Sequence, residues 1–196
     1  MKKLEFFEIK NLYEYEKIRE EMRRRVIDLK RRRRVQVGPH LSLVFENRQT
    51  VLFQIQEMVR AERIVEDAKV QDELDVYNDL IPDERELSAT LLIEIEDRSR
   101  VKEVLDRLMG IDSGEHVWAQ IGKQHAIPAG FEAGHSDAER GKISAVHFVR
   151  FRFTPEQVRA FRESEVFLVV DHPGEVARVR LPDEAKASLM DDLAGA

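Results

Sequence analysis

The sequence predicts an α+β fold in which an antiparallel or mixed sheet is covered by helices and a long amphipathic helix stands at the N-terminus. Two observations favour this class. The predicted strands are separated mainly by short turns, and short turns join antiparallel strands. The predicted helices are grouped early in the chain and between the hairpins, an order that is typical of a sheet with helices on one face.

The first predicted element is a helix over residues 11–33, because apolar side chains recur there every three or four positions. These side chains are Leu12, Tyr15, Ile18, Met22, Val26 and Leu29. A hairpin follows, because β-branched and alternating residues at 35–37 and 41–46 flank a Gly38–Pro39 turn.

Apolar spacing next predicts a second helix over 48–68 and a shorter one over 71–77, before the pattern breaks at 78–83. Strict alternation then predicts a strand over 87–95, with one row of side chains directed into a core. Residues 99–109 have the spacing of a further helix, which a glycine ends.

Two strands are predicted at 116–121 and 123–131, joined by a glycine turn. Small and polar residues between two glycines predict a mobile surface loop over 134–141. The clearest strand pattern of the chain follows at 143–153.

The last part of the chain begins with a capping box, in which Thr154 is the N-cap of a short helix and Gln157 is its partner. An apolar strand at 166–170 and a further strand at 176–180 flank a tight turn. A terminal helix from Pro182 onward completes the prediction.

Size and composition limit the chemistry that is available. The chain has 196 residues, enough for a single domain over 1–196, and 36% of them are charged. It has no cysteine, which excludes disulfides, thiolate nucleophiles and Cys-ligated metal sites. The longest apolar run, 166–170, is far too short to cross a membrane, and no export signal is present. We therefore expect a cytoplasmic protein.

A helical wheel of the second helix places three polar side chains among apolar ones, namely Gln54, Glu57 and Glu62. The same wheel places Gln56 on the polar side. A carboxylate among apolar side chains needs a partner, because burying it alone costs several kcal/mol. One alternative is an internal salt bridge or hydrogen-bond network. The other is a carboxylate that serves as a ligand of a divalent metal or as a general base.

His147 lies on the more apolar face of the 143–153 strand. A histidine there is either a neutral core residue or a ligand that faces Glu57 on the second helix. The candidate metal ligands are therefore Glu57, Glu62 and His147. His172 stands in a turn, where Asp171 would orient it, and a plain turn role is the alternative.

Cations are concentrated near the N-terminus although the formal net charge of the chain is −6. The steepest cluster comprises the candidate binding residues Arg31, Arg32, Arg33 and Arg34. They end a predicted helix, where cations face the negative end of its dipole, so that a solvated helix end or an intramolecular partner is favoured. Nucleic-acid binding is disfavoured, because no aromatic side chains lie between the arginines.

Several strings of the sequence are similar to a bacterial family of unknown function, DUF3501. They are Gln54–Met58, Glu62–Ile64, Tyr77–Pro82, Ser88–Glu94, Ser144–Phe148 and Val170–Pro173. The resemblance covers nearly the whole chain and implies a cytosolic role beside rubrerythrin-like and iron–sulfur redox proteins. It implies no catalytic residue. The strings include the candidate binding residues Gln54, Glu94 and His172.

Two functions follow as hypotheses. The first is a non-catalytic accessory or binding protein that works with a redox or iron-handling partner protein, either alone or as a homo-oligomer. The alternative is a metal-dependent or acid–base enzyme with a pocket between the second helix and the sheet. In that enzyme Glu57 and Glu62 are the carboxylates and His147 is the imidazole ligand or base.

Overall fold

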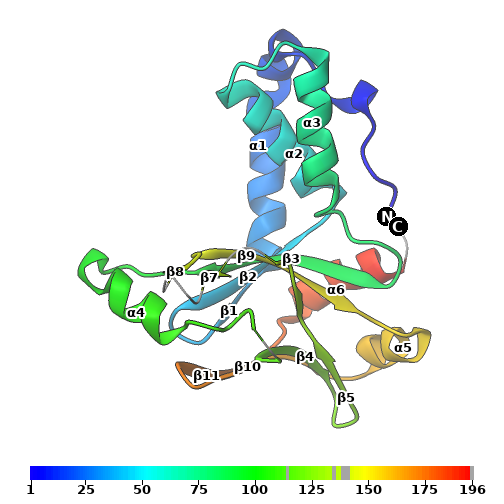
Figure 1. Ribbon diagram of the computed structural model, residues 1–196. Coiled ribbons are helices and arrows are strands. Elements are labelled where there is room, and N and C mark those ends of the chain that lie inside the picture. Colours follow the sequence, from blue (N-terminus) through cyan, green and yellow to red (C-terminus); the bar gives the residue numbers. More distant parts are fainter. Residues whose placement is uncertain (114, 134–135, 138–141, 195–196) are drawn as a thin grey trace.

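The computed structural model describes residues 1–113, 115–133, 136–137 and 142–194 (Figure 1). Its α-helices are α1 Leu12–Arg33, α2 Arg48–Ala61, α3 Asp67–Asn78, α4 Val101–Arg107, α5 Pro155–Glu163 and α6 Asp183–Leu193. Its strands are β1 Arg34–Val37, β2 Leu41–Glu46, β3 Glu86–Ile93, β4 Val117–Ile121, β5 His125–Pro128, β6 Gly130–Phe131, β7 Ser136–Asp137, β8 Lys142–Ile143, β9 Val146–Arg152, β10 Val166–His172 and β11 Glu175–Arg180. These helices and strands confirm the predicted α+β class.

The strands form two main sheets. A five-stranded sheet has the order β1-β2-β3-β9-β6 and a four-stranded sheet has the order β11-β10-β4-β5, while β7 and β8 pair separately. All of these pairings are antiparallel. In Figure 1 the helices α1, α2 and α3 stand as a lobe on one face of the five-stranded sheet, and the four-stranded sheet lies on the other side with α5 and α6.

The five-stranded sheet is covered on both faces, and the two faces differ in character. In β3 the side chains of Leu87, Ala89 and Leu91 belong to an apolar core that the two sheets share. The intervening Ser88 and Thr90 point to the opposite face, because side chains alternate along a strand. That opposite face carries the helical lobe, which has a second apolar cluster of its own. We call the first cluster the inter-sheet core.

The ends of several elements are as predicted. The side chain of Asn11 caps α1 by accepting from the backbone N–H of Glu14. Thr154 and Gln157 form the predicted capping box of α5, with Pro155 at its start. The β1–β2 hairpin turns at Gly38, whose φ of +78° favours glycine.

The helix predicted over 48–68 is shorter than expected. α2 ends at Ala61, and α3 begins at Asp67, within the predicted helix. The chain reverses at Arg63, which has a φ of +55°, and the N–H of Ile64 donates to the carbonyl of Val59 at 2.9 Å. This is a helix C-terminus with a left-handed residue, and arginine stands where glycine or asparagine is usual. The sequence therefore carried no ordinary stop signal.

Two predicted strands are also divided. The strand predicted over 123–131 becomes β5 and β6, which belong to different sheets. The strand predicted over 143–153 is interrupted between β8 and β9. Of the loop predicted over 134–141, only Ser136 and Asp137 lie within the described residues, and they pair with β8. Among the described residues, no helix has both the length and the apolar character needed to cross a membrane.

Candidate ligand-binding groove

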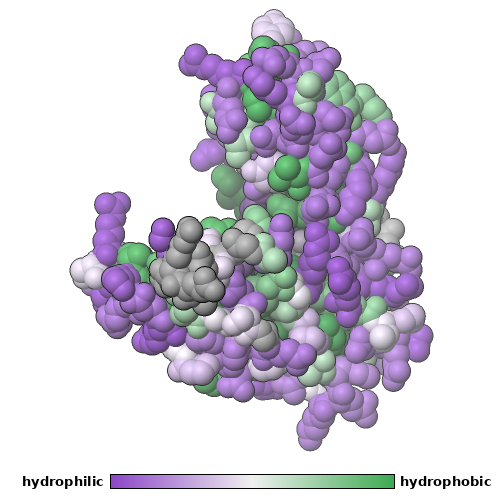
Figure 2. Space-filling model, viewed as in Figure 1, coloured by the Kyte–Doolittle hydropathy of each residue, from purple (hydrophilic) through white to green (hydrophobic). Residues whose placement is uncertain are grey.

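A groove of about 890 Å³ lies between α1, α2 and the helix-facing side of β2, β3 and β9. Apolar side chains provide much of its wall, among them Ile27, Phe53, Met58, Leu92, Val146 and Phe148. Ile27 and Val146 remain exposed to solvent. Figure 2 shows hydrophobic side chains gathered at the waist of the molecule, where the helical lobe meets the sheet. A volume of this order is typical of small-molecule sites, which span roughly 300–1,000 Å³.

Glu46 is the buried acid of this groove. It ends β2, and only 3% of its side chain is exposed. Its Oε1 accepts from Thr90 Oγ1 at 3.0 Å and from Lys30 Nζ at 3.4 Å. Its Oε2 is buried and has no hydrogen-bond partner within the described part of the chain. Leaving a buried acceptor unpaired costs about 1–3 kcal/mol, so, among the described residues, Glu46 carries beside the groove one oxygen that still needs a donor.

Glu57 also lines the groove, but its carboxylate is engaged. The Tyr15 hydroxyl donates to Oε1 at 2.7 Å, and Arg19 donates to Oε1 at 2.7 Å and to Oε2 at 2.9 Å. The hydrogen bond from Arg19 lowers the pKa of Glu57. Burial, followed by the bond to Glu57, raises the pKa of Tyr15. Glu57 therefore belongs to an internal network of hydrogen bonds and a salt bridge, which was one of its two alternatives.

Glu62 does not share this environment. It caps the C-terminal end of α2 with an exposed side chain, so the expectation that it is embedded among apolar residues is wrong. The physical reason is the early end of α2, which removes Glu62 from the helical wheel on which that expectation depended.

His147 is fully buried, as its apolar face suggested, but it lies on the opposite side of the sheet from Glu57. Its neighbour in β9, Phe148, lines the groove, whereas the His147 ring meets Phe131 edge-on in the inter-sheet core at 5.9 Å. Its Nε2 lies 2.9 Å from the carbonyl of Ser144, and its Nδ1 lies 3.7 Å from Asp112. The five-stranded sheet therefore separates the imidazole from the carboxylate of Glu57.

The predicted metal ligands Glu57, Glu62 and His147 are not brought together. Within the ranges that the structure describes, no three His, Asp or Glu side chains form a group that could hold a metal ion.

Arg33 is buried, so of the two alternatives for the arginine cluster the solvated helix end does not hold for this residue. Its guanidinium donates to the carbonyls of Phe45 at 2.9 Å and Glu46 at 3.0 Å, and to Ser188 Oγ at 3.0 Å. It also forms an ion pair with Asp192. Arg33 therefore has an intramolecular partner, which was the other alternative for the cluster.

The other three arginines diverge. Arg31 and Arg34 line the groove, whereas Arg32 lines a separate cavity beside α6. Arg31 has Asp28 at 3.8 Å and Arg32 has Glu184 at 3.8 Å. The four arginines thus do not form one binding surface, because consecutive side chains project in different directions around a helix end.

The remaining candidate residues take different places. Gln54 lines the groove. Glu94 accepts from Ser42 Oγ at 2.7 Å and pairs with Arg34. Both contacts lower the pKa of Glu94, and the hydrogen bond from Ser42 has the larger effect. Glu94 therefore holds Arg34 at the rim of the groove. His172 lies on β10, in the other sheet, and is not part of the groove.

Gln56 is a buried residue that the helical wheel assigned to the polar side. Its side chain accepts from the N–H of Lys10 at 2.7 Å and donates to the carbonyl of Lys10 at 3.0 Å. That face of α2 is buried because the segment before α1 packs against it, and a wheel of a single helix carries no signal for such a contact.

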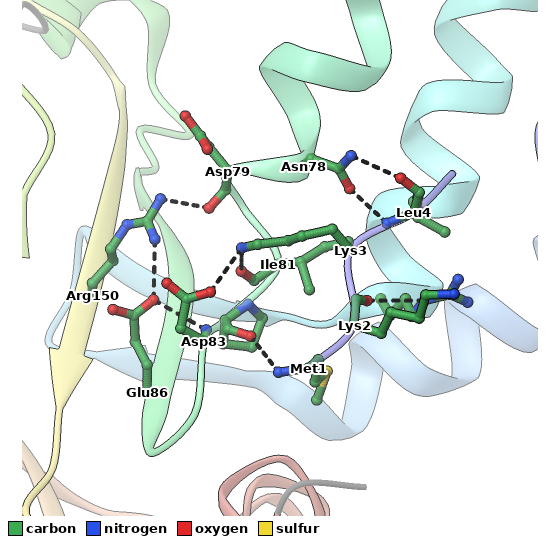
Figure 3. Close-up of polar contacts among 12 residues, drawn as sticks. Met1, Lys2, Lys3, Leu4, Asn78, Asp79, Ile81, Asp83, Glu86 and Arg150 are labelled. Carbon is green, nitrogen blue, oxygen red and sulfur yellow. Dashed lines mark hydrogen bonds and ion pairs between the residues drawn. The ribbon is translucent and has the colours of Figure 1, made fainter. Parts of the chain in front are cut away.

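The first residues of the chain are tied to the connection between α3 and β3 (Figure 3). The backbone of Leu4 exchanges two hydrogen bonds with the side chain of Asn78, at 2.8 and 3.0 Å. Lys3 pairs with Asp83 at 3.1 Å, and the N-terminal ammonium of Met1 donates to the carbonyl of Pro82 at 2.9 Å. The segment therefore closes the apolar cluster of the helical lobe, to which Leu4 belongs.

Glu46 is the residue of the groove that sequence reasoning missed. One signal in the sequence indicated that Glu46 would be buried. Glu46 lies on the row of β2 opposite to Leu43 and Phe45, and helices were expected to cover a face of the sheet. An acid at the end of that row becomes buried once helices cover it.

Fold and site together define an α+β protein with an apolar groove between a helical lobe and a sheet. The model of the family "Protein of unknown function (DUF3501)" matches residues 3–193, and the chain belongs to this family. A crystal structure of a novel protein of unknown function from Burkholderia pseudomallei K96243 is similar to this chain, with a TM-score of 0.89 and 33% sequence identity. The match covers 98% of this chain and 100% of that one. None of the curated proteins matches.

Proposed function

We propose that the protein is a non-catalytic binding protein and that its ligand occupies the groove. The observation that carries this proposal is Glu46, a buried carboxylate with one oxygen that lacks a donor among the described residues, at an apolar hollow of small-molecule size. An apolar hollow with a few convergent polar groups is the usual form of a ligand site.

The groove fits a ligand with an apolar body and one neutral hydrogen-bond donor. The apolar wall would cover the body, and the donor would satisfy Oε2 of Glu46. A neutral N–H or O–H suits this place better than an ammonium, because Lys30 already lies 3.4 Å from Glu46 and two arginines line the same groove. Lys30 already balances the charge of Glu46, so a second positive charge at this place gains little.

On the resemblance alone, we propose that the protein serves a redox or iron-handling partner protein in the cytoplasm. This partner and the formation of a homo-oligomer stay predictions. Size-exclusion chromatography with light scattering tests the oligomer, because a dimer doubles the mass of the 22.9 kDa chain.

The alternative function, a metal-dependent or acid–base enzyme, has less support. It requires Glu57, Glu62 and His147 to meet at a cavity between α2 and the sheet. The described residues place Glu62 at the surface and His147 beyond the sheet, so only Glu57 lines such a cavity.

The test uses phenyl-β-naphthylamine, a neutral fluorophore with an apolar ring system and a single N–H donor. We expect its fluorescence to rise on binding to the native protein. Glu46→Gln should weaken binding by about tenfold, because a hydrogen bond to a charged group contributes about 1.5–3 kcal/mol. Val146→Asp should weaken it as well, because a charge is placed in the apolar wall.

Val176→Asp is the matched control, since Val176 is also an exposed valine on a strand but lies far from the groove lining. It should leave the affinity unchanged. Circular dichroism of each variant establishes that it is folded. If folded Glu46→Gln and Val146→Asp bind the fluorophore as tightly as the wild type, the groove is not the binding site.

A further inference from the structure

We infer that the ligand of the groove is a small organic anion, with an apolar body, a neutral donor directed to Glu46 and an acidic group held at the mouth by Arg31. This inference rests on the proposed function. It adds the charge of the ligand, which the apolar wall and Glu46 do not specify.

Of the cations that line the groove, Arg31 has the longest and most exposed ion pair. Each acid that lines it has a cationic partner: Glu46 has Lys30 at 3.4 Å and Glu57 has Arg19 at 2.7 Å. The rim cation Arg34 is paired with Glu94. These three pairs are close to neutral, so they neither attract nor repel a charged ligand strongly.

Arg31 is the cation of the groove whose ion pair is weakest. Its described ionic partner is Asp28 at 3.8 Å, and the side chains of the two residues are 76% and 69% exposed. An exposed ion pair of this length contributes little to stability. The Arg31 guanidinium can therefore release Asp28 and bind an anionic group of a ligand. A guanidinium also binds carboxylate, sulfonate or phosphate oxygens with two parallel hydrogen bonds.

The two polar groups lie at different depths. The side chain of Glu46 is 3% exposed and that of Arg31 is 76% exposed, although both residues line the groove. A ligand that satisfies both needs its donor and its acid at opposite ends of an apolar body. This arrangement describes an amphipathic organic acid.

The dimensions favour a small molecule over a polypeptide. A protein partner usually covers about 800 Å² on each side, and the core of such a patch is broad and apolar. Within the described residues, Ile27 and Val146 are the large apolar side chains of this groove that remain exposed. Two side chains form the rim of a hollow and not a docking face.

The test compares two fluorophores that share one ring system. Phenyl-β-naphthylamine is neutral, and its derivative with a sulfonate on the ring remote from the amine is an anion with the same donor. At low ionic strength the wild type should bind the sulfonate about three- to fivefold more tightly than the neutral compound, which is the range of one exposed ion pair. In Arg31→Gln this preference should vanish, while the neutral compound should still bind in a Glu46-dependent way.

Arg25→Gln is the control, because Arg25 lies on the same helix with a side chain 77% exposed, and it is outside the groove. It should keep the preference, and added salt should reduce the preference in the wild type. Equal affinity for the two compounds, or a preference that persists in Arg31→Gln, would overturn the inference of an anion. Failure of the neutral compound to bind in a Glu46-dependent way would instead overturn the proposed function.

Discussion

Arg33 at the end of α1 and Asp192 in α6 form an ion pair whose two side chains are 1% and 4% exposed. The pair joins a helix near the start of the chain to the helix near its end. Further hydrogen bonds from the same guanidinium reach the carbonyls of Phe45 and Glu46 and both the carbonyl and the hydroxyl of Ser188. Burial raises the pKa of Asp192, and Arg33 acts in the opposite direction.

We expect Arg33→Met to lower the free energy of unfolding by about 3–5 kcal/mol, because Asp192 is left as a buried carboxylate without its partner. Urea denaturation at neutral pH measures this loss. Arg32→Met is the control and should cost less than about 1 kcal/mol, since Arg32 is 44% exposed. The double variant Arg33→Met with Asp192→Leu should recover part of the loss. Equal stabilities of Arg33→Met and Arg32→Met would contradict a structural role of the pair.

The stability that Glu57 provides should depend on pH. Its pKa is lowered in the folded protein by Arg19, so the contribution is complete above the unfolded value of about 4.3. It is lost as the pH falls through the lower folded value. We expect the free energy of unfolding of the wild type to exceed that of Glu57→Gln by about 1 kcal/mol at pH 7, and this excess to shrink as the pH falls below about 4. Glu62→Gln, at an exposed position, should not lower the free energy of unfolding at pH 7.

His172 should be neutral in the folded protein near neutral pH. The N–H of Gly174 donates to its Nδ1 at 3.0 Å, so the ring proton is on Nε2, which lies 3.1 Å from the carbonyl of Met109. A second proton on Nδ1 would face a donor. Burial also lowers the pKa of His172.

The stability contribution of His172 is therefore present above about pH 6.5, the usual value for histidine, and is lost as the pH falls through its lower folded pKa. Nuclear magnetic resonance titration of the ring should give a midpoint below 6.5. Denaturation curves of wild type and His172→Gln should converge as the pH is lowered. A midpoint above 6.5 would show that the imidazole is not held in this neutral form.

Gly174 should not tolerate a side chain. A Cβ at this position would lie 2.1 Å from the carbonyl oxygen of Arg107, which is backbone and cannot move aside alone. We expect Gly174→Ala to lower the free energy of unfolding by about 2 kcal/mol or more, as overpacking does. Gly130→Ala is the control, because its nearest contact would be an ordinary 3.7 Å. Thermal denaturation of the two variants measures the difference.

Local signals in the sequence predicted much of the fold, because they depend on neighbouring residues. The capping box at Thr154 and the turn at Gly38 are examples. The division between α2 and α3 could not be predicted in this way. Its left-handed residue is Arg63, and the sequence there has neither glycine nor proline.

The candidate site was predicted only in part, because burial depends on what packs against a residue. The sequence pointed to Glu57 and to the space between the second helix and the sheet, and the groove lies there. It did not show that His147 projects through the other face of β9. It also did not show which face of α2 is covered, so Gln56 was assigned to water although its amide is buried.

The two faces of the five-stranded sheet differ in polarity, and this difference determines how the strands align. Leu87 stands opposite Phe151, while the adjacent Ser88 stands opposite Arg150. A shift of one residue would exchange the two rows and force a guanidinium into an interior without water. Mispaired sheets of this kind are strongly penalised, so the row of the sheet that carries Ser88 and Arg150 also enforces correct strand registration during folding.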